Sequence, residues 1–144
     1  MRVSQTLILL PVFAQVLLTF AVLIAMAVAR QSSLKKNGQS VQDAALATDV
    51  FWDDPARRCS NNYKNQFELP VLFYAVCAFA LITRMVDIWF LVLAAAFAVS
   101  RIAHAVLHIR SNAVPNRAAA FLAGFVILVV LWVMLFVRMV AAGF

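Results

Sequence analysis

The chain has 144 residues, of which 65% are hydrophobic and only 12% are charged, and its formal net charge is +6. A soluble domain of this size exposes too much of its surface to hide so many apolar residues, so part of its solvent has to be lipid. The positive charge does not indicate nucleic-acid binding, because the aromatic residues lie within the hydrophobic runs and not between the basic residues. We expect attraction to anionic lipid instead.

The first hydrophobic run covers residues 7–29 and is interrupted only by Pro11, Gln15 and Thr19. As a helix it is long enough to cross a hydrocarbon core that is roughly 30 Å thick. A signal peptide is the alternative, because Arg2 precedes the run and an Ala-Val-Ala sequence ends it. The run is longer than the roughly 7–15 apolar residues of a signal peptide, so we predict a retained membrane helix.

The second span is preceded by a helix start. Asp54 is predicted to cap this helix, and Pro55 suits its first turn. The helix can continue through an apolar stretch, residues 67–83, which is the second predicted span, with Pro70 bending it. The loop before this span, residues 30–66, is polar, and we expect its least ordered part at the Lys-Lys-Asn-Gly sequence.

Two more hydrophobic runs, residues 87–107 and 118–138, complete the pattern, and a short polar link that contains a proline joins them. The fourth run has small residues at Ala120 and Gly124, a spacing that permits close packing of helices in membranes. We therefore predict an all-α fold in which residues 1–144 form a single transmembrane domain, a four-helix up-down bundle.

The basic residues are divided unevenly between the two sides of this bundle. The first and third loops carry eight of them, Arg30, Lys35, Lys36, Arg57, Arg58, Lys64, Arg110 and Arg117. The opposite side carries Arg2, Arg84 and Arg138. Because cytoplasmic loops are enriched in Lys and Arg, we predict that both loops are cytoplasmic and that both termini are periplasmic. The compact loops and the lack of eukaryotic retention signals favour a bacterial inner membrane.

Polar side chains at helical spacing meet at the cytoplasmic end of the predicted bundle. The first two helices contribute Arg30, Arg57, Asn61, Lys64, Asn65 and Glu68, and the last two contribute Arg101, His104, His108 and Arg117. A carboxylate at a membrane boundary is costly and is usually kept for a function. These residues predict a basic, hydrogen-bonding pocket with one carboxylate, suited to a small anionic molecule that also carries an amine.

Other interpretations of the same residues remain open. Glu68 can be a structural partner of Arg101 or Lys64 inside the bundle. His104 and His108 are one helical turn apart and can bind a metal ion with Glu68 as a third ligand. No further His or Cys is suitably placed in the sequence, so we predict neither a metal site nor a haem site.

The second helix resembles that of the MAPEG family, the membrane-associated proteins of eicosanoid and glutathione metabolism. The family has an Arg, then an Asn four residues later, a Glu three residues further on and a Pro soon after. Asn65, Glu68 and Pro70 match this pattern, whereas Asn61 stands in the place of the leading Arg. Lys64 stands where some members have a second Arg.

The other helices also resemble this family. The third helix of the family has the pattern Arg-x-x-(His or Tyr)-x-x-x-Tyr, which Arg101, His104 and His108 occupy with histidine in place of the final Tyr. Arg30 matches a basic residue that closes the first helix, and Arg117 matches an Arg that lies beside the glutathione sulfur in some members. The resemblance covers almost the whole chain.

The resemblance implies a homotrimer of four-helix subunits that bind glutathione between neighbours. It implies binding through Arg30, Asn61, Lys64, Asn65, Glu68, Arg101, His104 and His108, with Arg117 as the catalytic residue. Basic side chains suit the carboxylates of glutathione, Glu68 suits its amine, and a cation beside the sulfur favours the nucleophilic thiolate. The implied activity is that of a glutathione transferase or peroxidase acting on lipophilic electrophiles. A non-catalytic member that binds lipid or a partner is the alternative, favoured by the substituted Arg and Tyr.

Overall fold

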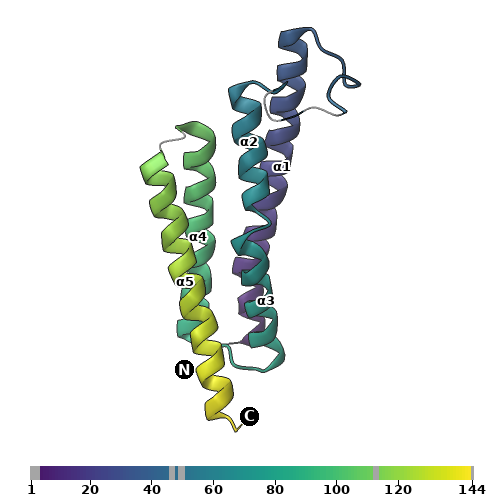
Figure 1. The fold of residues 1–144 in the computed structure, drawn as a ribbon. Coiled ribbons are helices and arrows are strands. Elements are labelled where there is room, and N and C mark those ends of the chain that lie inside the picture. The colour runs from purple at the N-terminus through teal and green to yellow at the C-terminus, as the bar shows by residue number, and fades with distance from the viewer. Residues whose placement is uncertain (1–3, 46–47, 49–50, 112–113, 144) are drawn as a thin grey trace.

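A computed structural model describes residues 4–45, 48, 51–111 and 114–143 of the chain. The described residues form helices and no strand (Figure 1): η1 (Gln5–Ile8), α1 (Leu9–Asn37), α2 (Asp54–Asn65), α3 (Leu69–Ile82), α4 (Ile88–Arg110) and α5 (Val114–Ala141). Four stretches are long and apolar enough to cross a membrane: Gln5–Asn37, Asp54–Ile82, Ile88–Arg110 and Val114–Ala141. The predicted class, an all-α four-helix membrane fold, is confirmed, while the predicted limits of each span stay a prediction.

The helices are arranged as two neighbouring groups (Figure 1). α2 and α3 follow one another along α1, and α4 packs chiefly on α5 beside them. At one end of the bundle α1 and α2 extend beyond α4 and α5. At the other end, η1 and the last turns of α5 both contact the turn between α3 and α4. The bundle therefore has two distinct polar ends, joined by an apolar middle.

The core lies where α3, α4 and α5 meet. Phe73 of α3 stacks on Phe97 of α4, with ring centroids 4.3 Å apart and ring planes 18° from parallel. Side chains from one stripe of α5 fill the third side of this core: Leu128, Leu131 and Leu135. Many large apolar side chains elsewhere stay exposed, among them Phe13, Leu17 and Phe136. Such extensive apolar exposure is expected of helices that face lipid.

Gly124 lets α4 and α5 approach closely. A Cβ atom added to Gly124 would lie 2.8 Å from the Ser100 hydroxyl oxygen, closer than real Cβ contacts. The Ser100 hydroxyl donates to the carbonyl of Phe97, at 2.7 Å, which satisfies it within its own helix. Of the small residues predicted at Ala120 and Gly124, Gly124 is buried at this helix contact and Ala120 is half-buried.

The prediction that the Lys-Lys-Asn-Gly sequence is the least ordered part of the loop is wrong, because α1 continues through it to Asn37. Gly38 ends the helix in the left-handed conformation, with φ of 62°. The N–H of Gly38 donates to the Lys35 carbonyl at 3.4 Å, and the N–H of Gln39 donates to the Leu34 carbonyl at 3.0 Å. This pair of bonds is a Schellman motif, which glycine adopts without a steric penalty. Lysines in the last turn also favour the negative end of the helix dipole.

Two other helix starts differ from the prediction. Asp53, and not Asp54, caps α2, because Asp53 has the extended backbone that a cap requires and its side chain accepts from the Ala56 N–H at 3.2 Å. Asp54 is instead the first residue of the helix and pairs with Arg57. The proline of the predicted link before the fourth span lies inside the first turn of α5, where its missing N–H costs nothing.

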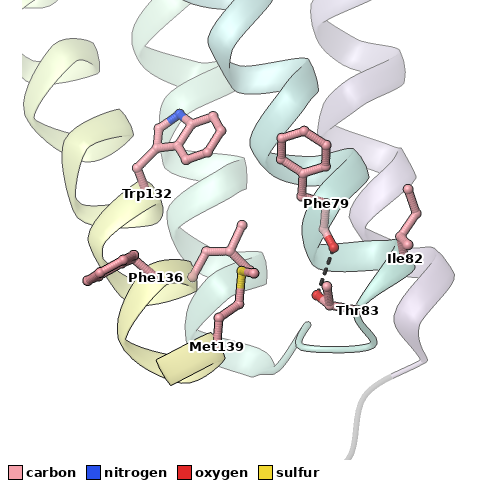
Figure 2. A pocket seen from close by; sticks show the side chains of 7 residues that line it. Phe79, Ile82, Thr83, Trp132, Phe136 and Met139 are labelled. Carbon is pink, nitrogen blue, oxygen red and sulfur yellow. Dashed lines mark hydrogen bonds between the residues drawn. The ribbon is translucent and has the colours of Figure 1, made fainter. Parts of the chain in front are cut away.

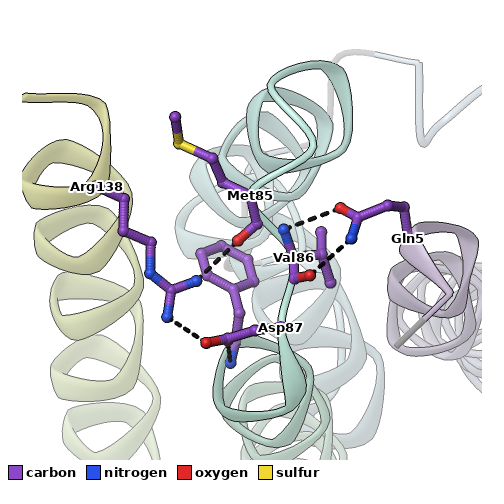
Figure 3. A network of polar contacts seen from close by, with 6 residues as sticks. Gln5, Met85, Val86, Asp87 and Arg138 are labelled. Atoms are coloured by element: carbon purple, nitrogen blue, oxygen red, sulfur yellow. Dashed lines mark hydrogen bonds and ion pairs between the residues drawn. The ribbon is translucent and has the colours of Figure 1, made fainter. Parts of the chain in front are cut away.

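Figure 3 shows the polar network that closes the bundle at the turn between α3 and α4. The side chain of Gln5 donates to the Val86 carbonyl at 2.8 Å and accepts from the Val86 N–H at 3.0 Å. From α5, Arg138 donates to the Met85 carbonyl at 2.8 Å and pairs with Asp87 at 2.7 Å. Three segments far apart in the sequence are thereby tied to one turn.

Asp87 lies just before α4 and outside the candidate span, and it has two roles. It caps α4 by accepting from the Phe90 N–H at 2.9 Å, and it pairs with Arg138. Partial burial opposes the charge of Asp87, but the hydrogen bonds from Phe90 and Arg138 and the charge of Arg138 outweigh it and lower the pKa of this carboxyl. The ionised form of Asp87 therefore stabilises the folded state.

We expect Asp87→Asn to lower the melting temperature of the detergent-solubilised protein at pH 7. Asn still caps the helix, so the loss is that of the ion pair, about 0.5–1 kcal/mol because both side chains are partly exposed. A lowered folded pKa gives stability above the unfolded value, near 3.8, that is lost as the pH falls through the folded value. The difference between variant and wild type should therefore vanish in acid.

The matched control is Asp54→Asn, which breaks the more exposed pair with Arg57, where 44% of the Arg57 and 63% of the Asp54 side-chain surface is accessible. We expect a smaller loss for this control. An Asp87→Asn protein as stable as wild type at pH 7, or a difference that persists in acid, would contradict the assigned role.

Candidate functional site

Buried polar side chains gather in the half of the bundle around the junction of α2 and α3. Gln15, Asn62, Gln66, Arg101, His104 and His108 are each at most 3% exposed. Polar groups that are buried without a hydrogen bond are costly, and more so in a membrane. The hydrogen-bond partners of these side chains therefore show which of them stabilise the fold and which still have donors or acceptors for a ligand.

The junction of α2 and α3 is a break in a single membrane-crossing stretch. Pro70 has no N–H for the Gln66 carbonyl, and in a continuous helix its ring would clash with that carbonyl. α2 therefore ends at Asn65 and α3 begins at Leu69. Two tighter bonds close the turn between them, from the Gln66 N–H to Tyr63 and from the Phe67 N–H to Lys64, both at 3.0 Å. The bend predicted at Pro70 is a full interruption.

The break makes the Asn65 carbonyl available to another helix. In an unbroken helix this carbonyl would accept from the N–H of residue 69. It accepts instead from Nη2 of Arg101, on α4, at 3.1 Å. The Arg101 side chain is fully buried, and its guanidinium carbon lies 5.6 Å from the centre of the Phe121 ring of α5.

Arg101 has more donors than partners. Its Nε and Nη1 atoms are buried and have no hydrogen-bond partner within the described part of the chain. Glu68, exposed at the start of α3, is the carboxylate whose charge acts on Arg101, but the pair is not within ion-pair distance. A buried guanidinium with two unused nitrogens is costly unless an anion or another acceptor is bound to it.

His104 lies one turn further along α4 and bridges two groups. Its Nδ1 atom is 3.1 Å from the carbonyl of Arg117, which can only accept, so Nδ1 carries the proton. Its Nε2 atom is then the acceptor for the side-chain amide of Asn65, at 3.2 Å. This pairing uses both ring nitrogens of a neutral histidine. His104 therefore orients Asn65 and the start of α5.

A cavity of about 450 Å³ adjoins these groups, within the size range of small-molecule sites. Residues of α2, α4 and α5 line it: Asn65, His104, Arg117, Ala118, Phe121 and Leu122. The lining combines a cationic side chain and amide or imidazole groups with an apolar wall. Such a lining suits an amphipathic molecule whose polar part is anionic.

The predicted site residues lie in three places: the cluster around Arg101, the exposed face of α2 with the break, and the contact between α1 and α2. Asn65, Arg101, His104 and Arg117 are brought together, and the His108 ring lies 5.7 Å from that of His104 with its Nδ1 buried and without a partner. The side chains of the outward face of α2 and the break are exposed: Asn61, Lys64 and Glu68.

Arg30 lies apart from this cluster, at the contact between α1 and α2. It donates from Nη2 to the Ser60 hydroxyl at 2.8 Å, and its guanidinium carbon lies 4.9 Å from the centre of the Trp52 ring. Within the single chain, Arg30 therefore lies outside the central cluster around Arg101. Ser60 and Trp52 contact the Arg30 guanidinium locally, while its buried Nε has no hydrogen-bond partner within the described part of the chain.

Asn62 and Gln66, on the buried face of the same α2–α3 junction, were missed by the sequence analysis. Their partner Gln15 was noticed only as an interruption of the first apolar run. The signal that could have found them is chemical: a side-chain amide inside a membrane helix bonds to another helix because lipid offers no partner. Which of the amides pair cannot be derived from spacing alone.

A second cavity, of about 340 Å³, lies at the opposite end of the bundle between α3 and α5 (Figure 2). It is lined by Phe79, Ile82, Thr83, Trp132, Leu135, Phe136 and Met139. The Thr83 hydroxyl is already used, because it donates to the Phe79 carbonyl at 2.7 Å. The surface of this cavity is apolar, so it offers little that could orient a polar ligand.

Comparison with known proteins gives one match. The family model described as the MAPEG family matches residues 8–137, nearly the whole chain. None of the curated proteins and none of the solved structures matches the chain. The match covers all the residues that form the cluster around Arg101.

The two histidines should differ in their contribution to stability. We expect His104→Phe to lower the free energy of unfolding by about 1–3 kcal/mol, because it leaves the Asn65 amide and the Arg117 carbonyl without their partner. His108→Phe, one turn away, removes a buried ring nitrogen that has no partner and should cost less. Thermal unfolding of both variants in the same detergent is the measurement. Equal losses for the two variants would show that His104 is not a bridge.

Proposed function

The chain belongs to the MAPEG family, and we propose that it binds glutathione at the cluster around Arg101. The observation that carries this proposal is the pair of donors, Nε and Nη1, that have no partner in the described part of the chain on the fully buried guanidinium of Arg101, whose neighbours Asn65 and Phe121 line the cavity. A carboxylate is the natural partner of such a group, because charge-assisted hydrogen bonds are stronger than neutral ones. Glutathione has two carboxylates, an amine and a thiol, so it fits both this donor set and the family.

The roles of the other residues follow from where they lie. Glu68, exposed and acting electrostatically on Arg101, holds the amine of glutathione. Asn65, oriented by His104, donates or accepts a hydrogen bond on the peptide part. Arg117 lines the cavity next to apolar Phe121 and Leu122. Bound glutathione supplies a thiol, and the cationic Arg117 beside it favours the nucleophilic thiolate.

We also propose that the site is completed in a homotrimer. Asn61, Lys64 and Glu68 are exposed on the outward face of α2 and the break in the single chain, although the family resemblance implies that they bind ligand. A neighbouring subunit against this face would turn an open surface into a cleft. Arg30 would then serve the site through its contact with α2, at Ser60.

The reaction proposed is attack of the thiolate on a lipophilic electrophile, or reduction of a lipophilic peroxide. Such substrates dissolve in the bilayer and reach the site between helices, past the apolar wall of the cavity. The proposed setting is a bacterial inner membrane with the first and third loops in the cytoplasm, in agreement with the excess of basic residues in those loops.

A member of the family that binds without catalysis is the second candidate. The substitutions Asn61 and His108, in place of the family Arg and Tyr, favour it. Asn61 removes a charge from the exposed face of α2, and His108 has a ring nitrogen that is buried without a partner. If catalysis is lost, binding at Arg101 is still expected.

Binding is tested by titrating the detergent-purified protein with glutathione while its thermal stability is measured. We expect stabilisation of the wild type at millimolar glutathione. Arg101→Met should weaken binding roughly 10- to 100-fold, because it removes charge-assisted hydrogen bonds. Glu68→Ala should weaken it as well. The matched control is Arg138→Met, which removes an arginine paired at the opposite end and should leave the affinity unchanged.

A conjugation assay with a reactive aryl halide separates the two candidates. Thiol conjugation by the wild type that is lost in Arg117→Met supports the transferase. Binding without conjugation supports the non-catalytic member. Absence of a glutathione-dependent shift in the wild type, or equal shifts in Arg101→Met and Arg138→Met, would overturn the proposed site.

A further inference from the structure

A chain of buried amides runs from α1 through the end of α2 to α4, beside the α2–α3 break. Gln15 of α1 donates to the side-chain oxygen of Gln66 at 2.9 Å. The amide nitrogen of Gln66 lies 3.2 Å from the backbone carbonyl and 3.3 Å from the side-chain oxygen of Asn62. Asn62 in turn donates to the Ala105 carbonyl of α4 at 3.3 Å. The three amide side chains are at most 1% exposed, so we call them the amide chain.

We propose that Gln66, held by Gln15 and Asn62, is a positioning residue for the ligand site, because it fixes the break that presents the Asn65 carbonyl to Arg101. This inference rests on the proposed function, since it concerns the same site. It assigns a purpose to side chains that do not line the cavity and are not part of the family pattern.

The position of Gln66 carries the inference. Gln66 is the first residue after α2 and directly follows Asn65. Its backbone N–H is bonded to Tyr63 and its side chain is bonded on both sides, so neither can rotate freely. The preceding residue, Asn65, is bonded to Arg101 and to His104. The break is thus clamped between the amide chain and the cluster around Arg101.

Release of the clamp has a specific consequence. Without its partners, Gln66 would let the turn rearrange, and the Asn65 carbonyl would no longer be held toward α4. Arg101 would then lose its one protein acceptor and could turn toward the exposed carboxylate of Glu68. A ligand carboxylate would have to compete with Glu68 for the guanidinium, so the affinity for glutathione would fall.

A purely structural role is the competing explanation, because amides commonly join helices in membranes. The chain offers a matched control for it. Gln5 also bonds to another part of the chain through both ends of its amide, at the Val86 N–H and carbonyl, but at the opposite end of the bundle. Removing Gln66 deletes its bonds to Gln15 and Asn62, and removing Gln5 deletes its bonds to the turn between α3 and α4, but only Gln66 and Gln15 adjoin the break.

The experiment compares Gln66→Leu, Gln15→Leu and Gln5→Leu in the full-length protein in one detergent. We expect all three to lower the melting temperature. The dissociation constant for glutathione should rise roughly tenfold in Gln66→Leu and Gln15→Leu, which corresponds to about one lost hydrogen bond, and should be unchanged in Gln5→Leu. If Gln66→Leu does not fold, Gln15→Leu tests the same clamp from α1.

The double variant Gln15→Leu/Gln66→Leu separates positioning from stability. Replacing both partners of a buried hydrogen bond by apolar groups can be nearly neutral, so the double variant should regain stability relative to either single variant. Its affinity for glutathione should stay low, because the break is still unclamped. Recovery of wild-type affinity in the double variant, or equal affinity in all single variants, would overturn the positioning role.

Amide hydrogen exchange in residues 64–72, without ligand, keeps this inference distinguishable from the proposed function. We expect exchange in this segment to be at least tenfold faster in Gln66→Leu than in the wild type or in Gln5→Leu. If the wild type binds no glutathione, the proposed function fails while faster exchange still supports the clamp. Unchanged exchange in Gln66→Leu would contradict the clamp whatever the result with glutathione.

Discussion

A proline inside a membrane-crossing segment leaves backbone carbonyls that lipid cannot hydrogen-bond. In this protein Pro70 divides one crossing into α2 and α3, and the Asn65 carbonyl freed by the break is bonded to Arg101 of α4. That bond places a charged guanidinium deep within the protein, where Phe121 covers one face. The break thereby supplies Arg101 with a backbone acceptor, while the Nε and Nη1 atoms of this buried arginine have no partner in the described part of the chain.

The two ends of the bundle differ in how completely their buried polar groups are hydrogen-bonded. At the turn between α3 and α4, Arg138 is paired with Asp87 and Gln5 with Val86, so the donors and acceptors satisfy one another (Figure 3). At the α2–α3 break, the Nε and Nη1 donors of Arg101 have no hydrogen-bond partner in the described part of the chain. A network whose donors and acceptors are all hydrogen-bonded favours a fixed structure, whereas buried donors without a partner near a cavity favour the binding of a ligand. This contrast directs the functional interpretation to one end of the molecule.

The sequence was sufficient for the fold class, because hydrophobic runs of spanning length admit few structures. It also located the residues that surround Arg101, since helical spacing brings Arg101 and His104 to one face. It was insufficient for helix ends, where α1 continues to its cap at Gly38 and Asp53 replaces Asp54 as the cap of α2, because these depend on backbone conformation. The amide chain escaped the sequence analysis for a different reason. Its pairing depends on how α1, α2 and α4 are rotated against each other, which residue spacing within one helix does not specify.

The most direct test is an experimental structure of the protein with glutathione bound, determined at a resolution that shows side-chain contacts. The result expected is a carboxylate of glutathione within hydrogen-bond distance of Nε or Nη1 of Arg101, with the Asn65 carbonyl still bonded to Nη2. A structure in which protein acceptors occupy Nε and Nη1 and glutathione lies elsewhere, or in which α2 and α3 form one unbroken helix, would contradict the central claim.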